Sequence, residues 1–193
     1  INVFGSGVIT DAKIFKGGID NLATSGVDIK DRLLISNKAH LIIPTHRALD
    51  AANEKALKNN KIGSTLKGIG PTYTDKTARR GLRIGDIAAD DFKARYERLK
   101  NIHLAQIKNL DFDMNELLLD KMPFDQYEEE WFKAIEFLKQ FQFIESEYFI
   151  NKSLDEGKRV LAEGAQGTLL DVDFGSYPFV TSSSVIAAGA CSG

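Results

Sequence analysis

The sequence predicts an α/β fold in which a mostly parallel sheet carries an inserted all-helical subdomain. A strand–helix–strand pattern occupies residues 1–36, a long stretch rich in Leu, Phe, Glu and Lys occupies 86–142, and Gly-punctuated apolar runs follow residue 157. A strand–helix–strand unit joins parallel strands, whereas the long stretch lacks strand-like alternation and is typical of amphipathic helices. We therefore expect a sheet domain in residues 1–36, a mostly helical subdomain in 37–143, and a return to the sheet domain in 144–193.

The first segment contains two predicted strands around one helix. Apolar residues lie close together in Ile1–Gly7, which ends in a Gly-Ser-Gly turn, and again in Asp31–Ser36. Between them, Asp11–Ser25 places its apolar residues at helical spacing, with Asp11 near the start. This pattern predicts a parallel pair of strands joined by a helix.

The middle segment is predicted to be helical on both sides of a Gly-rich stretch. Thr45 is a suitable N-cap for a helix that ends near Asn60. Further helices are predicted between residues 86 and 142, and Pro123 marks a break between two of them. The aromatic residues of this region recur at helical spacing, so we expect them to form a core and not a base-stacking surface.

The last segment begins with a predicted helix over Phe141–Asp155 and a short buried strand over Arg159–Glu163. Polar residues follow this strand in Glu163–Thr168. Because ligands of open parallel sheets bind beyond the carboxyl ends of strands, we expect part of the functional site there. Asp171 and Asp173 are candidates for a metal pair, but no other ligands lie at a recognisable spacing, and we favour turn chemistry as the alternative.

The composition excludes several classes of protein. The net charge is −2, so overall charge favours neither a nucleic-acid partner nor a membrane partner. The single cysteine, Cys191, excludes an intrachain disulfide, and no apolar run has the length of a membrane span or the pattern of a signal peptide. We therefore expect a cytoplasmic location. The chain starts at Ile1 without Met and stops after small residues, so we expect a fragment of a longer protein.

The stretch Ile62–Gly85 has the composition of an anion-binding loop. Its glycines allow backbone amides to turn toward a ligand, and its hydroxyl and cationic side chains are suitable donors to phosphate. The cations are Lys67, Lys76, Arg79, Arg80 and Arg83. We predict that the Gly/Arg-rich loop 62–86 binds a nucleotide phosphate. A surface loop with solvated arginines is the alternative, and RNA binding is disfavoured because no stacking aromatics are interleaved.

One histidine in the middle segment is a candidate for catalysis. His46 follows the predicted N-cap and could act as a general base. A lone histidine near a helix start is more often structural, and we favour that alternative.

Three blocks of the sequence are particularly distinctive. They are IGSTLKGIGPTYTDKTARRGLRIGD at 62–86, HRALDAANEK at 46–55 and LAEGAQGTLLDVDFGSYPFVTSS at 161–183. In this order and separation they resemble the adenylosuccinate synthetase family. The resemblance runs across essentially all 193 residues and covers a little under half of the family's full-length chain. It departs at Ser184-Val185-Ile186, where the family has Asn-Thr-Thr.

The resemblance implies a GTP-dependent ligase of purine (AMP) biosynthesis. Members of the family join inosine monophosphate (IMP) and L-aspartate to form adenylosuccinate, with Mg²⁺, through a 6-phosphoryl-IMP intermediate. An oxygen at the purine 6-position is a poor leaving group until it is phosphorylated, and that transfer requires positioned donors and cations. The resemblance also implies a sheet of the P-loop-NTPase-like type and a homodimer.

Four residues match the family's IMP site. Thr65 and Thr181 correspond to hydroxyl donors to the 5′-phosphate. Arg79 corresponds to the arginine that reaches across the dimer interface to the partner subunit's nucleotide. Gln166 corresponds to the glutamine that contacts the base at its 6-position, and is the one catalytic contact expected in this chain.

The other catalytic parts of the family fall outside this sequence. Its GTP phosphate loop and its catalytic aspartate and histidine would precede Ile1, and its guanine-reading and aspartate-binding C-terminal domain would follow Gly193. The Mg²⁺ ligands belong to those parts, so we expect no metal site in this chain. We also expect no turnover by the chain alone. A non-catalytic purine-nucleotide-binding module is the alternative function.

Overall fold

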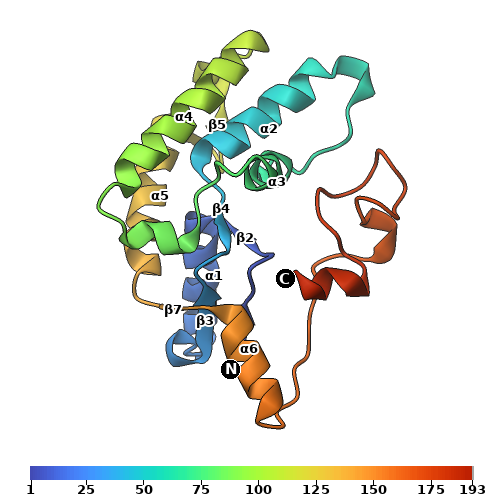
Figure 1. Cartoon of the computed structure of the whole chain (residues 1–193). Coiled ribbons are helices and arrows are strands. Elements are labelled where there is room, and N and C mark those ends of the chain that lie inside the picture. Colours follow the sequence, from blue (N-terminus) through green and yellow to red (C-terminus); the bar gives the residue numbers. More distant parts are fainter. Residues whose placement is uncertain (193) are drawn as a thin grey trace.

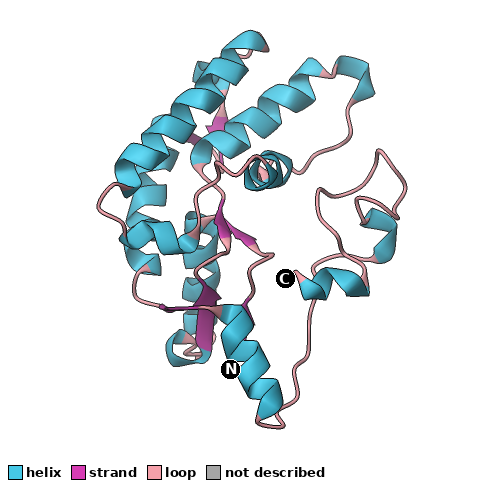
Figure 2. Ribbon diagram, in the orientation of Figure 1, coloured by secondary structure: helices cyan, strands magenta, loops and turns pink. Residues whose placement is uncertain are grey.

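A computed structural model describes residues 1–192 and confirms the predicted α/β class, with short strands near the centre of the molecule and helices around them (Figures 1 and 2). The strands are β1 (Asn2–Phe4), β2 (Ile9–Thr10), β3 (Leu33–Ser36), β4 (His40–Leu41), β5 (Leu118–Leu119), β6 (Met122–Pro123) and β7 (Gln142–Ile144). The helices are α1 (Ala12–Thr24), α2 (Pro44–Ala56), α3 (Ile69–Thr77), α4 (Phe92–Asn109), α5 (Phe124–Leu138) and α6 (Ser146–Asp155).

The main sheet is parallel and has the order β1-β3-β7. Val3 pairs with Leu34, and α1 connects the two strands, so the predicted strand–helix–strand unit is confirmed. All four residues of β3 are buried, as a central strand covered on both faces requires. A smaller parallel pair, β2 with β4, continues from the end of this unit.

Strand β7 corrects the prediction of a helix over Phe141–Asp155. Gln142–Ile144 pairs in parallel with β3, with Phe143 opposite Ile35, and α6 begins only at Ser146. The free edge of β3 offers backbone partners to this short segment, and such tertiary pairing outweighs the local helical pattern.

Helix α1 begins where the sequence predicts. The Asp11 carboxylate accepts hydrogen bonds from the backbone amides of Lys13 at 2.9 Å and Ile14 at 3.3 Å, as an N-cap does. Its buried Phe15 packs edge-to-face against Phe4, with ring centroids 5.9 Å apart, and the helix lies against α5. The cap and the aromatic contact together fix α1 on the sheet.

Helix α2 begins two residues earlier than predicted, and its N-cap is Ile43 instead of Thr45. Pro44 occupies the first helical position, where its fixed φ is favourable and its missing N–H has no consequence. The amide of Ile43 donates to His46 Nδ1 at 3.0 Å, so the histidine replaces the expected hydroxyl at this helix end. The Thr45 hydroxyl bonds to His103 Nδ1 instead, at 2.7 Å.

The helical part of the chain packs around Trp131 of α5. This side chain is fully buried, its ring stacks on Tyr96 with centroids 5.3 Å apart, and its Nε1 donates to the carbonyl of Ile42 at 3.0 Å. Pro123 is the residue before α5, so the predicted break is confirmed. The aromatic side chains of α4 and α5 thus form a core, as their spacing predicts.

The prediction of a buried strand over Arg159–Glu163 is wrong. This segment is extended but exposed, and Leu161 is 92% exposed. Within residues 1–192 no strand pairs with it, and an unpaired segment gains no ladder hydrogen bonds that would hold it as a strand. Figure 1 shows the chain after α6 running past the sheet to a compact segment beside α3.

Within the described chain, no helix combines the length and apolarity that crossing a bilayer requires. The predicted division into residues 1–36, 37–143 and 144–193 stays a prediction.

Replacing Trp131 with Ala should lower the free energy of unfolding by about 3–5 kcal/mol, because it removes a large buried ring and leaves a cavity. Urea denaturation followed by circular dichroism measures the change. Tyr148→Ala is the matched control, since Tyr148 is 72% exposed and its loss should cost less than about 0.5 kcal/mol. Equal losses in the two variants would contradict the assignment of Trp131 to the core.

Candidate functional site

The Gly- and Arg-rich stretch folds as a loop, a helix and a turn. The prediction of a loop throughout is therefore wrong for Ile69–Thr77, which forms α3. Gly68 precedes the helix with φ +76°, a conformation that favours glycine. A Cβ at Gly68 would lie 3.0 Å from backbone atoms of His46 and Arg47. Close packing of Gly68 against the start of α2 thus allows α3 to form, although the composition of this stretch is typical of loops.

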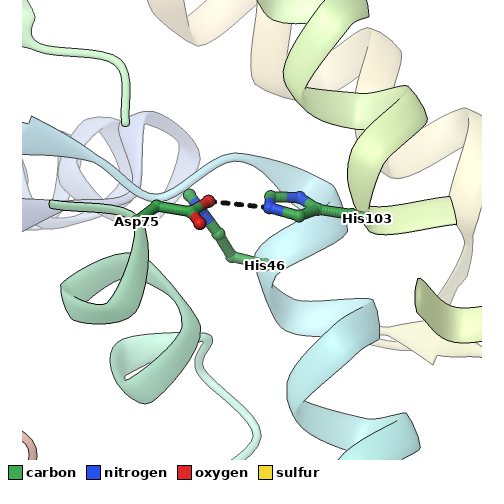
Figure 3. A group of neighbouring side chains, drawn as sticks. All are labelled: His46, Asp75 and His103. Atoms are coloured by element: carbon green, nitrogen blue, oxygen red, sulfur yellow. Dashed lines mark hydrogen bonds and ion pairs between the residues drawn. The ribbon is translucent and has the colours of Figure 1, made fainter. Parts of the chain in front are cut away.

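A buried polar cluster joins α3 to its neighbours (Figure 3). His46 of α2 and His103 of α4 both approach Asp75 Oδ2 through Nε2, at 2.9 and 2.7 Å, and all three side chains are buried. The guanidinium of Arg80, just after α3, donates to the other carboxylate oxygen at 2.6 Å. One carboxylate therefore connects three helices.

The hydrogen bonds of His46 fix the position of its proton. His46 Nδ1 accepts from a backbone amide, so its Nε2 carries the proton that is donated to Asp75. Burial lowers the pKa of His46 to about 4, which keeps the ring neutral. Burial alone would raise the pKa of Asp75, but hydrogen bonds from His103, His46 and Arg80 outweigh burial and lower it well below its usual range. The cluster is an ionised carboxylate satisfied by three donors.

This donor set does not fit a metal ion. His46, Asp75 and His103 place one ligand atom each within 4.8 Å of one another. A metal requires lone pairs on the histidine nitrogens, whereas both Nε2 atoms face a carboxylate that needs their protons. Mg²⁺ further prefers a shell of oxygen atoms. With its ring buried and both nitrogens engaged, His46 fits the structural role that we favoured over catalysis.

Asp171 has turn chemistry and does not form a metal pair with Asp173. Its buried carboxylate accepts hydrogen bonds from backbone N–H groups of two later segments of the chain. The donors are Asp173, Phe174, Val185 and Ile186, at 2.6–3.1 Å. Burial would raise the pKa of Asp171, but these amides outweigh it and hold the carboxyl ionised. Its oxygens are thus used to fold the segment beside α3.

A cleft of about 610 Å³ separates α3 from this segment. Its walls are Gly70, Tyr73, Thr74, Thr77 and Ala78 on the side of α3, and Val172, Tyr177, Val180, Thr181 and Ser182 on the other side. The Tyr73 hydroxyl donates to the carbonyl of Gly7 at 3.0 Å, which ties α3 to the turn after β1. The cleft therefore has hydroxyl and apolar side chains on both walls, a suitable lining for a small polar ligand.

The four predicted site residues lie around α3 but do not all meet. Thr181 lines the cleft, Thr65 is exposed in the loop before α3, and Arg79 is exposed immediately after it, with φ +60°. The helix has nine residues and is about 14 Å long, so it separates Thr65 from Arg79. Gln166 is exposed in the segment after α6. It is not one of the described residues that line the cleft.

The cations of the stretch divide into two groups. Arg80 is held by Asp75, and Lys67 lies 3.6 Å from Asp120, so both take part in pairs within the fold. Lys76 Nζ donates to the carbonyl of Ser6 at 3.4 Å. The composition alone does not distinguish these residues from an exposed arginine such as Arg79.

Sequence reasoning missed some residues that build this region. Tyr73 and Thr74 line the cleft, and Asp50 and Glu54 of α2 contact the loop around Thr65. The two acids are four residues apart, which places them on one helix face beside a loop rich in amides. That spacing was the available signal for their role.

Comparisons with known proteins identify relatives of the whole chain. The family model described as adenylosuccinate synthetase matches residues 1–193. The adenylosuccinate synthetase of Flavobacterium psychrophilum is 53% identical over 193 residues, covering 100% of this chain and 44% of the relative. That of Bacteroides fragilis is 52% identical with the same coverage. The chain thus spans less than half the length of these relatives.

A solved structure is also similar. It is described as fully ligated adenylosuccinate synthetase from Plasmodium falciparum, and it matches with a TM-score of 0.78 and 32% identity, over 99% of this chain and 42% of that chain. This likeness confirms the α/β fold that was predicted to be of the P-loop-NTPase-like type.

The low pKa of His46 predicts a pH dependence of stability. Between pH 6.5 and about 4 the unfolded chain binds a proton at this ring and the folded chain does not, so the free energy of unfolding falls as the pH falls. We expect His46 to account for up to about 3 kcal/mol of the loss. Urea titrations at pH 7 and 4.5 should give a smaller difference for His46→Gln than for the wild type. If the variant and the wild type lose the same free energy of unfolding between these pH values, the folded protein does not keep His46 neutral.

The hydrogen bonds of the cluster also predict that metal ions do not change the stability of the protein. Adding Zn²⁺ or EDTA should leave the thermal midpoint unchanged, because the Nε2 lone pairs that a metal needs are protonated. Differential scanning fluorimetry measures this. A saturable rise with Zn²⁺ that disappears in Asp75→Asn would show that the cluster is a metal site.

Proposed function

Because the chain belongs to the adenylosuccinate synthetase family, we propose that it is the IMP-binding part of a GTP-dependent ligase of AMP biosynthesis. The whole protein joins IMP and L-aspartate to form adenylosuccinate. The single observation that carries this proposal is the family match over all 193 residues. The location of three predicted site residues around α3 and its cleft supports it.

Thr65 and Thr181 bind the 5′-phosphate of IMP in this proposal. Thr181 faces α3 across the cleft, and Thr65 stands on the loop that enters the same helix. Hydroxyl donors near a helix start suit a phosphate, because the amides and the dipole of that helix end also favour negative charge. Both hydroxyls are assigned to the same 5′-phosphate in this proposal.

Arg79 serves the nucleotide of the partner subunit in a homodimer. It lies at the far end of α3 from Thr65, exposed and outside the pairs that hold Arg80 and Lys67. An arginine at that end is poorly placed for the phosphate at the start of its own helix. An exposed guanidinium suits a phosphate or ribose presented by another subunit.

Gln166 contacts the purine 6-position, where the chemistry takes place. GTP supplies the phosphoryl group that converts the 6-oxygen into a leaving group, and the aspartate amine then displaces it from 6-phosphoryl-IMP. The glutamine amide can donate to the 6-oxygen and hold the base in line for this transfer. Contacts to Mg²⁺ and to GTP are assigned to parts of the protein outside this chain.

The isolated chain binds without turnover, because catalytic groups act as a unit and several belong to other parts of the protein. The proposed location is the cytoplasm, and the proposed partners are IMP, L-aspartate, GTP and a second copy of the protein. A purine-nucleotide-binding module without catalysis is the second candidate. It predicts that the full-length protein binds IMP and forms no product.

The full-length protein should form adenylosuccinate only when IMP, L-aspartate, GTP and Mg²⁺ are all present, as measured by chromatography of the reaction mixture. Thr65→Ala and Arg79→Ala should each raise the KM for IMP by about 10- to 100-fold, the effect of losing a hydrogen bond to a charged group. Lys93→Ala removes an exposed positive charge from α4 and is the control, with no expected change.

Mixing the two variants tests the shared site. A heterodimer of Thr65→Ala and Arg79→Ala chains contains one site with both residues intact if Arg79 acts across the interface, so activity should return on mixing. If Arg79 acts in its own subunit, every site lacks one residue and activity stays low. Absence of adenylosuccinate from the wild-type protein would refute the synthetase function itself.

A further inference from the structure

Two acidic side chains of α2 lie beneath the loop that carries Thr65. Asp50 and Glu54 are one helical turn apart, and their exposed fractions are 7% and 9%. Buried carboxylates require donors, and both find them in residues 62–68. The two acids therefore act on the loop and not on solvent.

Glu54 holds the first part of the loop. Its two carboxylate oxygens accept hydrogen bonds from the backbone amides of Ile62 and Gly63, each at 3.2 Å. Gly63 has φ +86°, a conformation that only glycine adopts readily. The carboxylate thus fixes the turn that leads into Thr65.

Asp50 holds the loop on both sides of Thr65. The Ser64 hydroxyl donates to Asp50 Oδ1 at 2.6 Å and accepts from the amide of Leu66 at 3.2 Å, while the amide of Gly68 donates to Oδ2 at 2.9 Å. Leu66 has φ +57°, a left-handed conformation that is strained for residues other than glycine. These bonds keep the strained backbone in place.

We propose that Asp50 and Glu54 are positioning residues that hold the loop 62–68 so that the Thr65 hydroxyl faces the phosphate of IMP. The proposal rests on the proposed function, because it concerns the same site. The hydrogen bonds of both acids go to neighbours of Thr65 and not to Thr65 itself, and neither acid is a catalytic residue. Their bonds fix Gly63, Ser64, Leu66 and Gly68, the residues on either side of an exposed threonine.

The sign of the charge makes this arrangement informative. Two carboxylates beside a phosphate site oppose the anion unless their charge is directed into other donors. Here each carboxylate accepts two hydrogen bonds from the loop. The ordering of the loop must then outweigh the residual repulsion, and removal of an acid should weaken binding although it removes negative charge.

A double-mutant cycle in the full-length enzyme tests the proposal. Asp50→Asn should raise the KM for IMP by about tenfold, with kcat and the KM values for GTP and aspartate little changed. Thr65→Ala should have a similar effect, and the double variant should be much less impaired than the product of the two effects. Ser64→Ala removes only the hydroxyl between Asp50 and Leu66, and should give a rise of a few-fold even if Asp50→Asn fails to fold.

Glu116→Gln is the matched control. Glu116 is mostly exposed and lies outside α2. Its carboxylate is 3.9 Å from the Nζ of Lys55, which lies on the same helix as Asp50 and Glu54. Its substitution should leave every kinetic constant unchanged. An unchanged KM for IMP in both Asp50→Asn and Ser64→Ala, or full additivity with Thr65→Ala, would overturn the positioning role alone. A wild-type enzyme that forms no adenylosuccinate would overturn the proposed function and, with it, this proposal.

Discussion

The buried carboxylate of Asp75 is the interaction on which the arrangement of the candidate site depends. Only Thr72 and Asp75 are buried among the residues of α3, so this short helix has little apolar surface to hold it. Its position is fixed by polar contacts, chiefly those of Asp75 with His46 and His103. Loss of these donors would leave a buried charge without compensation, which strongly destabilises a protein interior.

The location of α3 in turn sets the geometry of the site. The loop that carries Thr65 leads into one end of the helix, and Arg79 follows the other end. The face between the two ends forms one wall of the cleft that Thr181 lines. A shift of α3 would therefore alter all three positions together. The neutral ring of His46 suits this purpose, because it supplies a hydrogen bond to Asp75 without placing further positive charge in the interior.

Much of the fold could be predicted from local patterns, and the failures have a common cause. Asp11 and the apolar spacing after it were sufficient to place α1, because a cap and a helical stripe are local signals. The strand β7 and the segment Arg159–Glu163 were both misjudged, because a strand is stabilised by a partner elsewhere in the chain. One segment finds an edge on β3 and the other finds no partner within residues 1–192.

The site shows the same division between local and tertiary information. The composition of residues 62–86 was enough to predict an anion site, and the family resemblance singled out Thr65 and Arg79. The composition alone could not separate Arg79 from Arg80, since that difference arises only when Asp75 is brought beside Arg80. The acids beneath the loop were missed because negative charge is not sought beside a phosphate site.

Arg47 connects the start of α1 to the loop that carries Thr65. Its guanidinium donates to Tyr127 at 2.6 Å, and the Tyr127 hydroxyl donates to Asp11, the cap of α1, at 2.7 Å. The same guanidinium binds Asp120 and also donates to the carbonyl of Leu66 at 3.4 Å. A chain of buried and partly buried hydrogen bonds thus runs from the start of α1 to the residue after Thr65. Since polar networks in a low-dielectric interior resist partial disruption, the loop is held to the rigid part of the fold from beneath by carboxylates and from the side by an arginine. What stays free to meet a ligand is the threonine between them.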